Sequence, residues 1–340
     1  MREAMFIKKN AEKWKTYQHQ ETKNPDETAE RFITLIDDLS YAKTFYPRSK
    51  VTRWINGITA SIYQSIYQNK KEKYSRIFQF WKFELPMLFK KHHRVFLFTT
   101  ILFALFVAIG VLTSLNDTAV LRSIVGNDYV DSTERSIRDG NPFGVYSADQ
   151  STFNMFARIA FNNIFVAFRM FIGGLTVGLF TLKDLWTNGV MLGSFQYFFF
   201  EHGLGTQSIL VIWIHGTIEI SSIIIAGTAG FVLANGILFP RTYTRMASFK
   251  RGIKDAAKIL ICLIPFFITA AFLESYITRL MSDSFQKGNS GMPIWLSVLI
   301  LSGSFLLIIW YFVILPIRLS KRGYFIKDDG IVSRLNETNA

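Results

Sequence analysis

The chain has 340 residues, of which 50% are hydrophobic and 16% aromatic, with a mean hydropathy of +0.23. Because the apolar residues form long blocks, these values exclude an ordinary soluble domain and indicate a membrane protein. The net charge of +13 comes largely from Lys and Arg beside those blocks, which favours contact with anionic membrane lipid over nucleic-acid binding. A single cysteine, Cys262, excludes an internal disulfide.

Residues 1–94 form a basic segment with 19 Lys and Arg against 10 Asp and Glu. Apolar residues at helical spacing predict one helix over residues 27–45 and another over residues 51–67. A third, amphipathic helix is predicted over residues 70–94, with Lys and Arg beside its apolar face. This pattern is typical of a helix that lies in the headgroup layer of the membrane. The alternative is a helix whose apolar face packs against the headpiece. We therefore predict a helical cytoplasmic headpiece.

Six apolar segments follow, and we predict transmembrane helices at about residues 95–112, 159–182, 185–200, 209–240, 258–277 and 293–315. Residues 113–150 carry six acids and three arginines, whereas Lys and Arg dominate the other long polar segments. The positive-inside rule then places residues 113–150 outside and both termini in the cytoplasm. The predicted fold is all-α, with a six-helix transmembrane domain over residues 95–317 and a cytoplasmic tail over residues 318–340.

Two pairs of glycines lie four residues apart within predicted spans: Gly174 with Gly178, and Gly189 with Gly193. Small residues at this spacing let helix backbones approach closely, so we expect helix packing at both pairs. The same pairs would suit a homodimer, and the sequence leaves the oligomeric state open.

Polar residues interrupt the predicted spans at a few places. His215 and Glu219 lie four apart and so share a helical face. At a rise of 1.5 Å per residue, Arg169 and Glu219 both lie about 14–15 Å below the outer surface, which predicts an ion pair between them. Three more polar residues, Asn162, Asn163 and Glu274, lie nearer the outside. We therefore predict an outward-open polar vestibule lined by these three residues and His215.

Three interpretations of these polar residues compete: links between helices, a site for an ion, proton or amphiphile, and metal-dependent catalysis. His215 and Glu219 alone are a weak metal signal, because the sequence has no H-E-x-x-H motif and no Cys/His cluster. We predict no cofactor and leave a metal undecided. Walker A, G-x-S-x-G and Rossmann motifs are also absent from the sequence, which argues against nucleotide-driven or serine-type chemistry.

Several segments resemble the stage II sporulation protein M family: DDLSYAKTFYPRSKVTRWING (37–57), ELP (84–86), FNNIFVAF (161–168), Asn188-Gly189 with Gly193, HGTIEISSIIIAGTAG (215–230) and AAFLES (270–275). The resemblance covers about residues 1–320. It implies a multi-pass protein of the prokaryotic plasma membrane with no established enzymatic activity. Matching positions that the resemblance marks as candidate functional residues are Asn162, Asn163, His215, Gly216, Glu219 and Glu274.

The resemblance further implies a scaffold that recruits peptidoglycan-remodelling machinery, with MoxR-type ATPases among the candidate partners. We expect this non-enzymatic role, with membrane lipid as a further partner and no nucleic acid. A transporter or lipid- or ion-handling channel built on the polar vestibule is the alternative, and an intramembrane metalloenzyme is a third.

Overall fold

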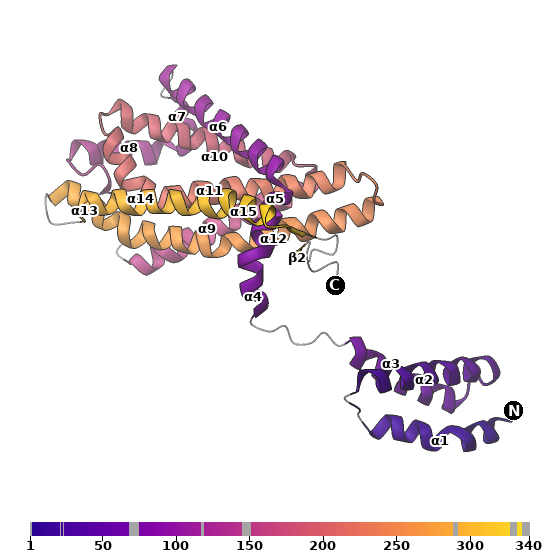
Figure 1. The fold of residues 1–340 in the computed structure, drawn as a ribbon. Helices are drawn as coiled ribbons and strands as arrows, with labels where there is room; N and C mark the ends of the chain where they lie inside the picture. Colours follow the sequence, from indigo (N-terminus) through magenta and orange to yellow (C-terminus); the bar gives the residue numbers. More distant parts are fainter. Residues whose placement is uncertain are drawn as a thin grey trace. The chain divides into compact units, whose positions relative to one another are not determined.

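The computed structural model describes residues 2–20, 22, 24–67, 75–116, 119–144, 151–287, 292–326 and 332–334. These residues form two compact units, Met1–Arg76 and Ile77–Ala340 (Figure 1). The boundary falls earlier than the predicted end of the headpiece at residue 94. Residues 77–94 therefore belong to the second unit. The first residues of the predicted amphipathic helix, 70–74, lie outside the described range.

The first unit consists of α1 (Glu3–His19), α2 (Pro25–Phe45) and α3 (Lys50–Tyr67). The local sequence favours a helix start at α2. The Asn24 side chain caps the helix by accepting a hydrogen bond from the Asp26 amide, and Pro25 occupies the first turn. Trp14 is fully buried and donates from Nε1 to Asp38 Oδ2 at 2.7 Å. The unit has a hydrophobic core of its own, made by Phe6, Trp14, Leu35, Leu39, Ala42, Val51, Ile55 and Ile58.

Among its described residues, the regular structure of the second unit is helical apart from one small hairpin. In chain order, its elements are α4 (Ser75–Gln79, which begins just before the boundary), η1 (Phe80–Glu84), α5 (Leu85–Lys91), α6 (His93–Asn116), α7 (Ala119–Val125), α8 (Asn127–Arg138), α9 (Thr152–Gly173), η3 (Gly174–Thr176), α10 (Leu179–Glu201), α11 (Gly205–Leu238), α12 (Arg245–Phe272), η4 (Leu273–Thr278), α13 (Arg279–Lys287), α14 (Ile294–Ile309), η5 (Trp310–Ile314), α15 (Leu315–Lys321), β1 (Tyr324–Ile326) and β2 (Val332–Arg334). The strands pair antiparallel, with Phe325 opposite Ser333. The all-α class is thus correct apart from this hairpin within the tail.

Within the described residues, five helical stretches are long and apolar enough to cross a membrane: His93–Asn116, Thr152–Thr176, Gly205–Leu238, Arg245–Phe285 and Ile294–Lys321. The third predicted span corresponds to α10, whose 23 residues would extend about 34 Å. It falls outside the set of five because Lys183, Asp184 and Asn188 make it more polar. Five candidate spans are therefore established, and the sixth crossing and the orientation of the termini stay predictions.

The α11 helix lies at the centre of the second unit, packed against α12, α9, α14, α10 and α6. More than half of its 34 residues are buried, and many are small or β-branched. Beside it, α10 packs along α6 (Figure 1). A Cβ on Gly189 would lie 2.6 Å from the Phe106 Cβ, and one on Gly193 would overlap the Val107 carbonyl. This pair therefore permits close packing of two helices, as its spacing predicts.

The other glycine pair does not form one helical stripe. Gly174 packs against the backbone of Gly230 on α11, so it does serve a close approach. Gly178, however, is the N-cap of α10 and has a φ of 87°, and the preceding Val177 is also left-handed. These two residues end the helical run that the sequence analysis extended to residue 182, because left-handed backbone cannot continue a right-handed helix.

Polar contacts join the segment 77–91 to the rest of the second unit. Asp255 of α12 accepts from Lys91 Nζ at 2.7 Å and lies 2.9 Å from His92 Nε2. Glu84 pairs with Lys258 on the same helix. The Tyr311 hydroxyl donates to the Trp81 carbonyl at 2.6 Å. Ion pairs to α12 and a hydrogen bond from η5 thus hold this segment against the bundle.

Candidate functional site: a polar cavity among the membrane helices

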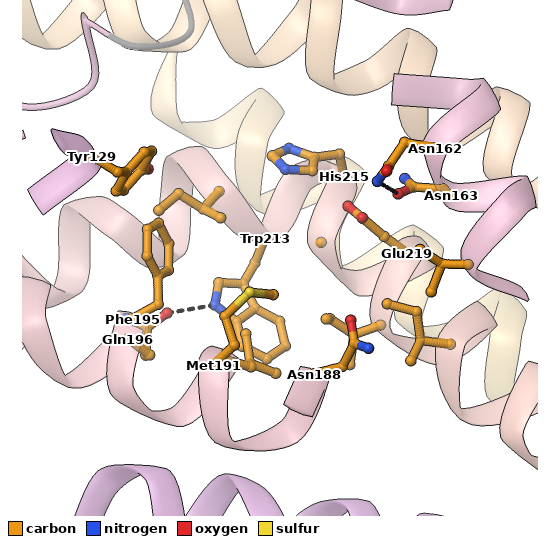
Figure 2. Close-up of a pocket in the computed structure, with 16 residues that line it drawn as sticks. Tyr129, Asn162, Asn163, Asn188, Met191, Phe195, Gln196, Trp213, His215 and Glu219 are labelled. Carbon is orange, nitrogen blue, oxygen red and sulfur yellow. Dashed lines mark hydrogen bonds between the residues drawn. The ribbon is translucent and has the colours of Figure 1, made fainter. Parts of the chain in front are cut away.

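A cavity of about 330 Å³ lies among α9, α10 and α11, with α8 at one end (Figure 2). Its sixteen lining residues come from α8 and from three consecutive helices, α9, α10 and α11. They are Tyr129, Asn162, Asn163, Val166, Asn188, Met191, Leu192, Phe195, Gln196, Ile212, Trp213, His215, Gly216, Glu219, Ile220 and Ile223. No lysine or arginine is among these described lining residues.

Five of the candidate site residues from the sequence analysis line this cavity: Asn162, Asn163, His215, Gly216 and Glu219. Glu274, which was also predicted to line the vestibule, is not among the lining residues. Asn162 donates to Asn163 Oδ1 at 3.3 Å. Asn163 is only 6% exposed, and its Nδ2 has no hydrogen-bond partner among the described residues. A Cβ on Gly216 would meet nothing within 4 Å, so this glycine adds space to the cavity.

The opposite end of the cavity is aromatic and is held in place by hydrogen bonds. Trp213 Nε1 donates to Gln196 Oε1 at 2.9 Å, and Gln196 Nε2 donates to Ser208 Oγ at 2.8 Å. The rings of Tyr129 and Phe195 lie 6.1 Å apart across this end. Burial raises the pKa of Tyr129 to about 12, so its hydroxyl stays protonated at neutral pH. The cavity therefore has a polar end at Glu219 and an aromatic end at Tyr129.

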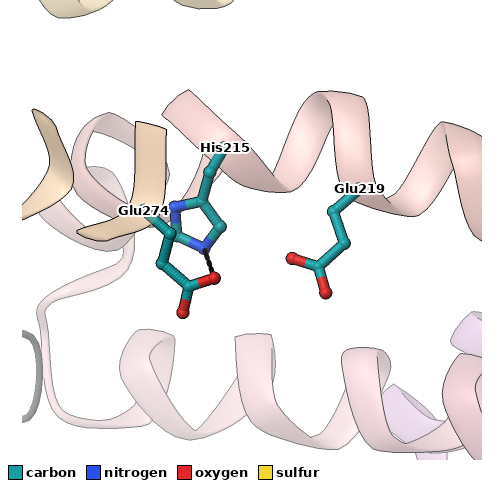
Figure 3. Close-up of side chains that lie close together, drawn as sticks. All are labelled: His215, Glu219 and Glu274. Carbon is teal, nitrogen blue, oxygen red and sulfur yellow. Dashed lines mark ion pairs between the residues drawn. The ribbon is translucent and has the colours of Figure 1, made fainter. Parts of the chain in front are cut away.

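Glu274 joins His215 and Glu219 at the edge of the cavity, although it is 55 residues from Glu219 in the sequence (Figure 3). The ligand atoms of the three side chains all lie within 4.8 Å of one another. His215 Nε2 lies 3.9 Å from Glu274 Oε2. On its other side, His215 Nδ1 lies 2.9 Å from the buried Thr278 Oγ1. His215 is 4% exposed, and both glutamates are half-buried.

A local change of helix geometry places Glu274 in this group. Glu274 and Thr278 both lie in η4, a π-helical stretch that continues α12. A π-helical turn holds more residues than an α-helical turn, so it changes which side chains face the neighbouring helix, and such turns are frequent at functional sites. The sequence analysis selected Glu274 for its depth in the membrane but did not predict the π-helical turn or Thr278.

The predicted ion pair between Arg169 and Glu219 is wrong. Arg169 Nε instead donates to Asp184 Oδ2 at 2.8 Å, and the Arg169 side chain is 52% exposed. The helix that carries Arg169 runs from Thr152 to Gly173, so Arg169 lies about 6 Å from its end rather than near its middle. Residues 169 and 184 lie symmetrically about the turn at residues 174–178, and the α9–α10 hairpin therefore brings them together.

Sequence reasoning also missed several cavity residues outside the predicted set, including Tyr129, Asn188, Gln196 and Trp213. A usable signal was present on α10. Asn188 and Gln196 are eight residues apart in an otherwise apolar stretch, which places them near one helical face. Tyr129 gave no such signal, because it comes from the segment between the first two predicted spans.

With the geometry established, comparison with known proteins identifies the family. Residues 98–279 match the stage II sporulation protein M family, which is more than half of the chain. The chain belongs to this family. The matched range runs from α6 to the first residue of α13, so it contains every residue that lines the cavity as well as Glu274.

Other matches add little about activity. Residues 4–68 match a family described as a domain of unknown function, and this range falls within the first compact unit. An uncharacterized protein of Methanocaldococcus jannaschii is 34% identical over 128 residues, which is 36% of this chain and 70% of that protein. No solved structure matches this chain.

Proposed function

We propose that this stage II sporulation protein M family member takes a small polar ligand, an ion or the head group of an amphiphile, into the cavity among α9, α10 and α11. It would do so as a transporter or channel-like protein of the prokaryotic plasma membrane, without breaking bonds. The observation that carries this proposal is the cavity itself, which is lined by Asn163, His215 and Glu219 inside candidate membrane spans.

The energetics of burial support a ligand. Placing a carboxylate at membrane depth costs about 2.5–3.5 kcal/mol, so ionisable residues there commonly mark a path or binding site. A purely structural link would be expected to satisfy its polar atoms, whereas Nδ2 of the buried Asn163 has no hydrogen-bond partner among the described residues. The volume of about 330 Å³ is near the lower end for small-molecule sites and would hold roughly ten waters.

The direction of access follows from the predicted topology. Six crossings with both termini in the cytoplasm would place α7 and α8 outside, because residues 113–150 carry an acidic balance. Tyr129 of α8 lines the aromatic end of the cavity. We therefore propose that a ligand enters past Tyr129 and reaches Glu219. Residues 117–118 and 145–150 of this segment lie outside the described range.

Two neighbouring positions on α9 provide a sharp test. Asn162 lines the cavity, whereas Phe161 is 75% exposed on an apolar side of the bundle that would face lipid. Each is replaced by cysteine in a Cys262→Ala background, and intact cells are treated with a charged, membrane-impermeant thiol reagent. We expect reaction at position 162 and none at 161, because thiolates form in water but not in lipid. Equal protection of both cysteines would contradict a water-filled, outward-open cavity.

A second candidate function, the scaffold that recruits envelope-remodelling machinery, is supported by the first compact unit. Between Glu3 and Tyr67, the described residues of this unit form three helices with their own core, which is the arrangement expected of a module that binds partners, such as MoxR-type ATPases, or anionic lipid. Self-association as a homodimer belongs to this proposal.

The two candidate functions respond differently to variants. Deletion of residues 1–67 should abolish partner recruitment and leave the cavity reagent-accessible, whereas Glu219→Gln should leave recruitment intact. Recruitment that survives the deletion would contradict the scaffold role of this unit.

A further inference from the structure

His215, Glu219 and Glu274 present one imidazole and two carboxylates to a common point at the edge of the cavity. We propose that this group binds a divalent transition-metal ion of the zinc class. The inference deepens the proposed function and rests on it, because it names the chemical class of the ligand that the cavity receives. The argument uses the charge of the group, the orientation of the histidine, the distances and the open side of the site.

When both carboxylates of the group are ionised, their charges favour a positive partner. Two carboxylates with oxygens less than 5 Å apart repel each other strongly where water is scarce. Arg169, the cation predicted for this role, is paired with Asp184 instead. Arg158 acts electrostatically on Glu274 from an exposed position. A divalent ion would neutralise both carboxylates directly, and a neutral imidazole would complete the donor set without adding charge.

The orientation of His215 fits metal binding. Its Nδ1 lies 2.9 Å from Thr278 Oγ1, where an Nδ1–H can donate to the hydroxyl oxygen. That tautomer leaves the Nε2 lone pair facing Glu274. Metal-binding histidines are usually held in this way, with one ring nitrogen on the metal and the other donating to a nearby oxygen. Thr278 is fully buried, so it holds the ring in a fixed position.

The distances are close to those of an assembled site. Zinc–nitrogen and zinc–oxygen bonds of about 2.0–2.2 Å in a tetrahedron separate neighbouring ligand atoms by about 3.4 Å. The ligand atoms here lie within 4.8 Å, and the His215–Glu274 pair is at 3.9 Å. Side-chain rotations that move the ligand atoms by about 1 Å would therefore bring three donors onto one ion. No shift of a helix is needed.

An independent observation points to a ligand at the open side of the site. Glu219 also lines the cavity, and the 94%-buried Asn163 lies beside it with its Nδ2 unpartnered (Figure 2). With three protein donors, a fourth position would face the cavity, as in zinc sites that keep a position for water or another ligand. The Asn163 amide lies where it can donate to a Glu219 oxygen and so orient that carboxylate.

The donor set also selects the class of ion. Imidazole suits zinc, iron, copper and nickel, whereas magnesium and calcium prefer sites made only of oxygen donors. With one nitrogen and two carboxylates, we expect Zn²⁺ to bind much more tightly than Mg²⁺ or Ca²⁺.

The test uses the full-length protein, purified in detergent and stripped with a chelator, and measures Zn²⁺ binding by calorimetry and by metal analysis after desalting. We expect one Zn²⁺ per chain that excess Mg²⁺ does not displace. Glu219→Gln, Glu274→Gln and His215→Gln should each weaken binding at least about tenfold. The matched controls Glu201→Gln and His19→Gln change exposed residues of the same types and should bind as the wild type does.

X-ray absorption of the Zn²⁺-loaded wild-type protein keeps the test independent of whether the variants fold. We expect only nitrogen and oxygen neighbours at about 2.0–2.2 Å, with the outer-shell scattering of one imidazole. Absence of Zn²⁺ binding, equal binding by all site variants and controls, or a sulfur neighbour would overturn the proposal.

Failure of the metal site can be distinguished from failure of the proposed function. If Zn²⁺ does not bind but the cysteine at position 162 reacts from outside, the cavity admits another ligand and only the metal inference fails. If that cysteine is protected, the proposed outward cavity fails whatever the metal result.

Discussion

The packing of α10 on α6 gives a prediction whose sign follows from geometry, for the substitution Gly193→Ala. The new Cβ would overlap the Val107 carbonyl oxygen and lie 3.0 Å from the carbonyl carbon of Val107 and the amide nitrogen of Val111. Ordinary carbon contacts are about 3.5–4.0 Å, so the helices must separate. Backbone atoms cannot rotate away as a side chain would. Overpacking of this kind costs about 1–3 kcal/mol.

The matched control is Gly303→Ala on α14, where an added Cβ meets nothing within 4 Å. Alanine is favoured over glycine within a helix by about 0.5–1 kcal/mol, so this variant should be slightly more stable than the wild type. Gly193→Ala has the same gain in helix preference, but the overpacking cost exceeds it, so this variant should be less stable than the wild type. The free energies of unfolding of the two variants should differ by about 1–3 kcal/mol.

The assay is unfolding of the purified protein in mixed detergent and SDS, followed by tryptophan fluorescence. The chain has seven tryptophans, among which Trp186 contacts Phe106 across the α6–α10 interface. A Gly193→Ala variant as stable as Gly303→Ala would refute the close packing of α10 on α6.

Two further predictions concern charged groups. Arg169→Gln leaves the buried Asp184 carboxylate without this cation and should destabilise the protein by about 1–3 kcal/mol. Asp184→Asn leaves a half-exposed guanidinium that water can solvate, so it should cost less than about 1 kcal/mol. The reverse order of stability in the same unfolding assay would contradict the assigned pair. The hydrogen bond from Arg122 lowers the pKa of Asp131, so this stabilisation of α7 on α8 is present above the ordinary Asp pKa of about 3.9 and is lost as pH falls through the lowered value. Hydrogen exchange should show α8 amides losing protection only below about pH 4 in the wild type. The same pH dependence of protection in Arg122→Gln would exclude the Arg122–Asp131 hydrogen bond as its cause.

The fold class could be predicted from the sequence with good detail. Apolar blocks of spanning length identify five helices because helix formation in lipid depends on local composition, which a single sequence contains. The helix boundaries were less accurate. Signals for the α9 boundaries were present in Ser151, whose side chain caps the helix, and in Gly178, but apolar content extended the predicted span past the latter. This shift of boundary led directly to the wrong partner for Arg169.

The sequence by itself determined that the chain is a membrane protein and that His215 and Glu219 share a face, because a separation of four residues fixes their relative position on any α-helix. Only the tertiary structure decided that Glu274 and Thr278 face His215, since this depends on a π-helical turn in another helix and on how α12 packs against α11. The cavity has the same origin. Its walls come from helices whose contacts are set by glycines, a tight turn and side-chain shape acting together, and none of these alone specifies a cavity.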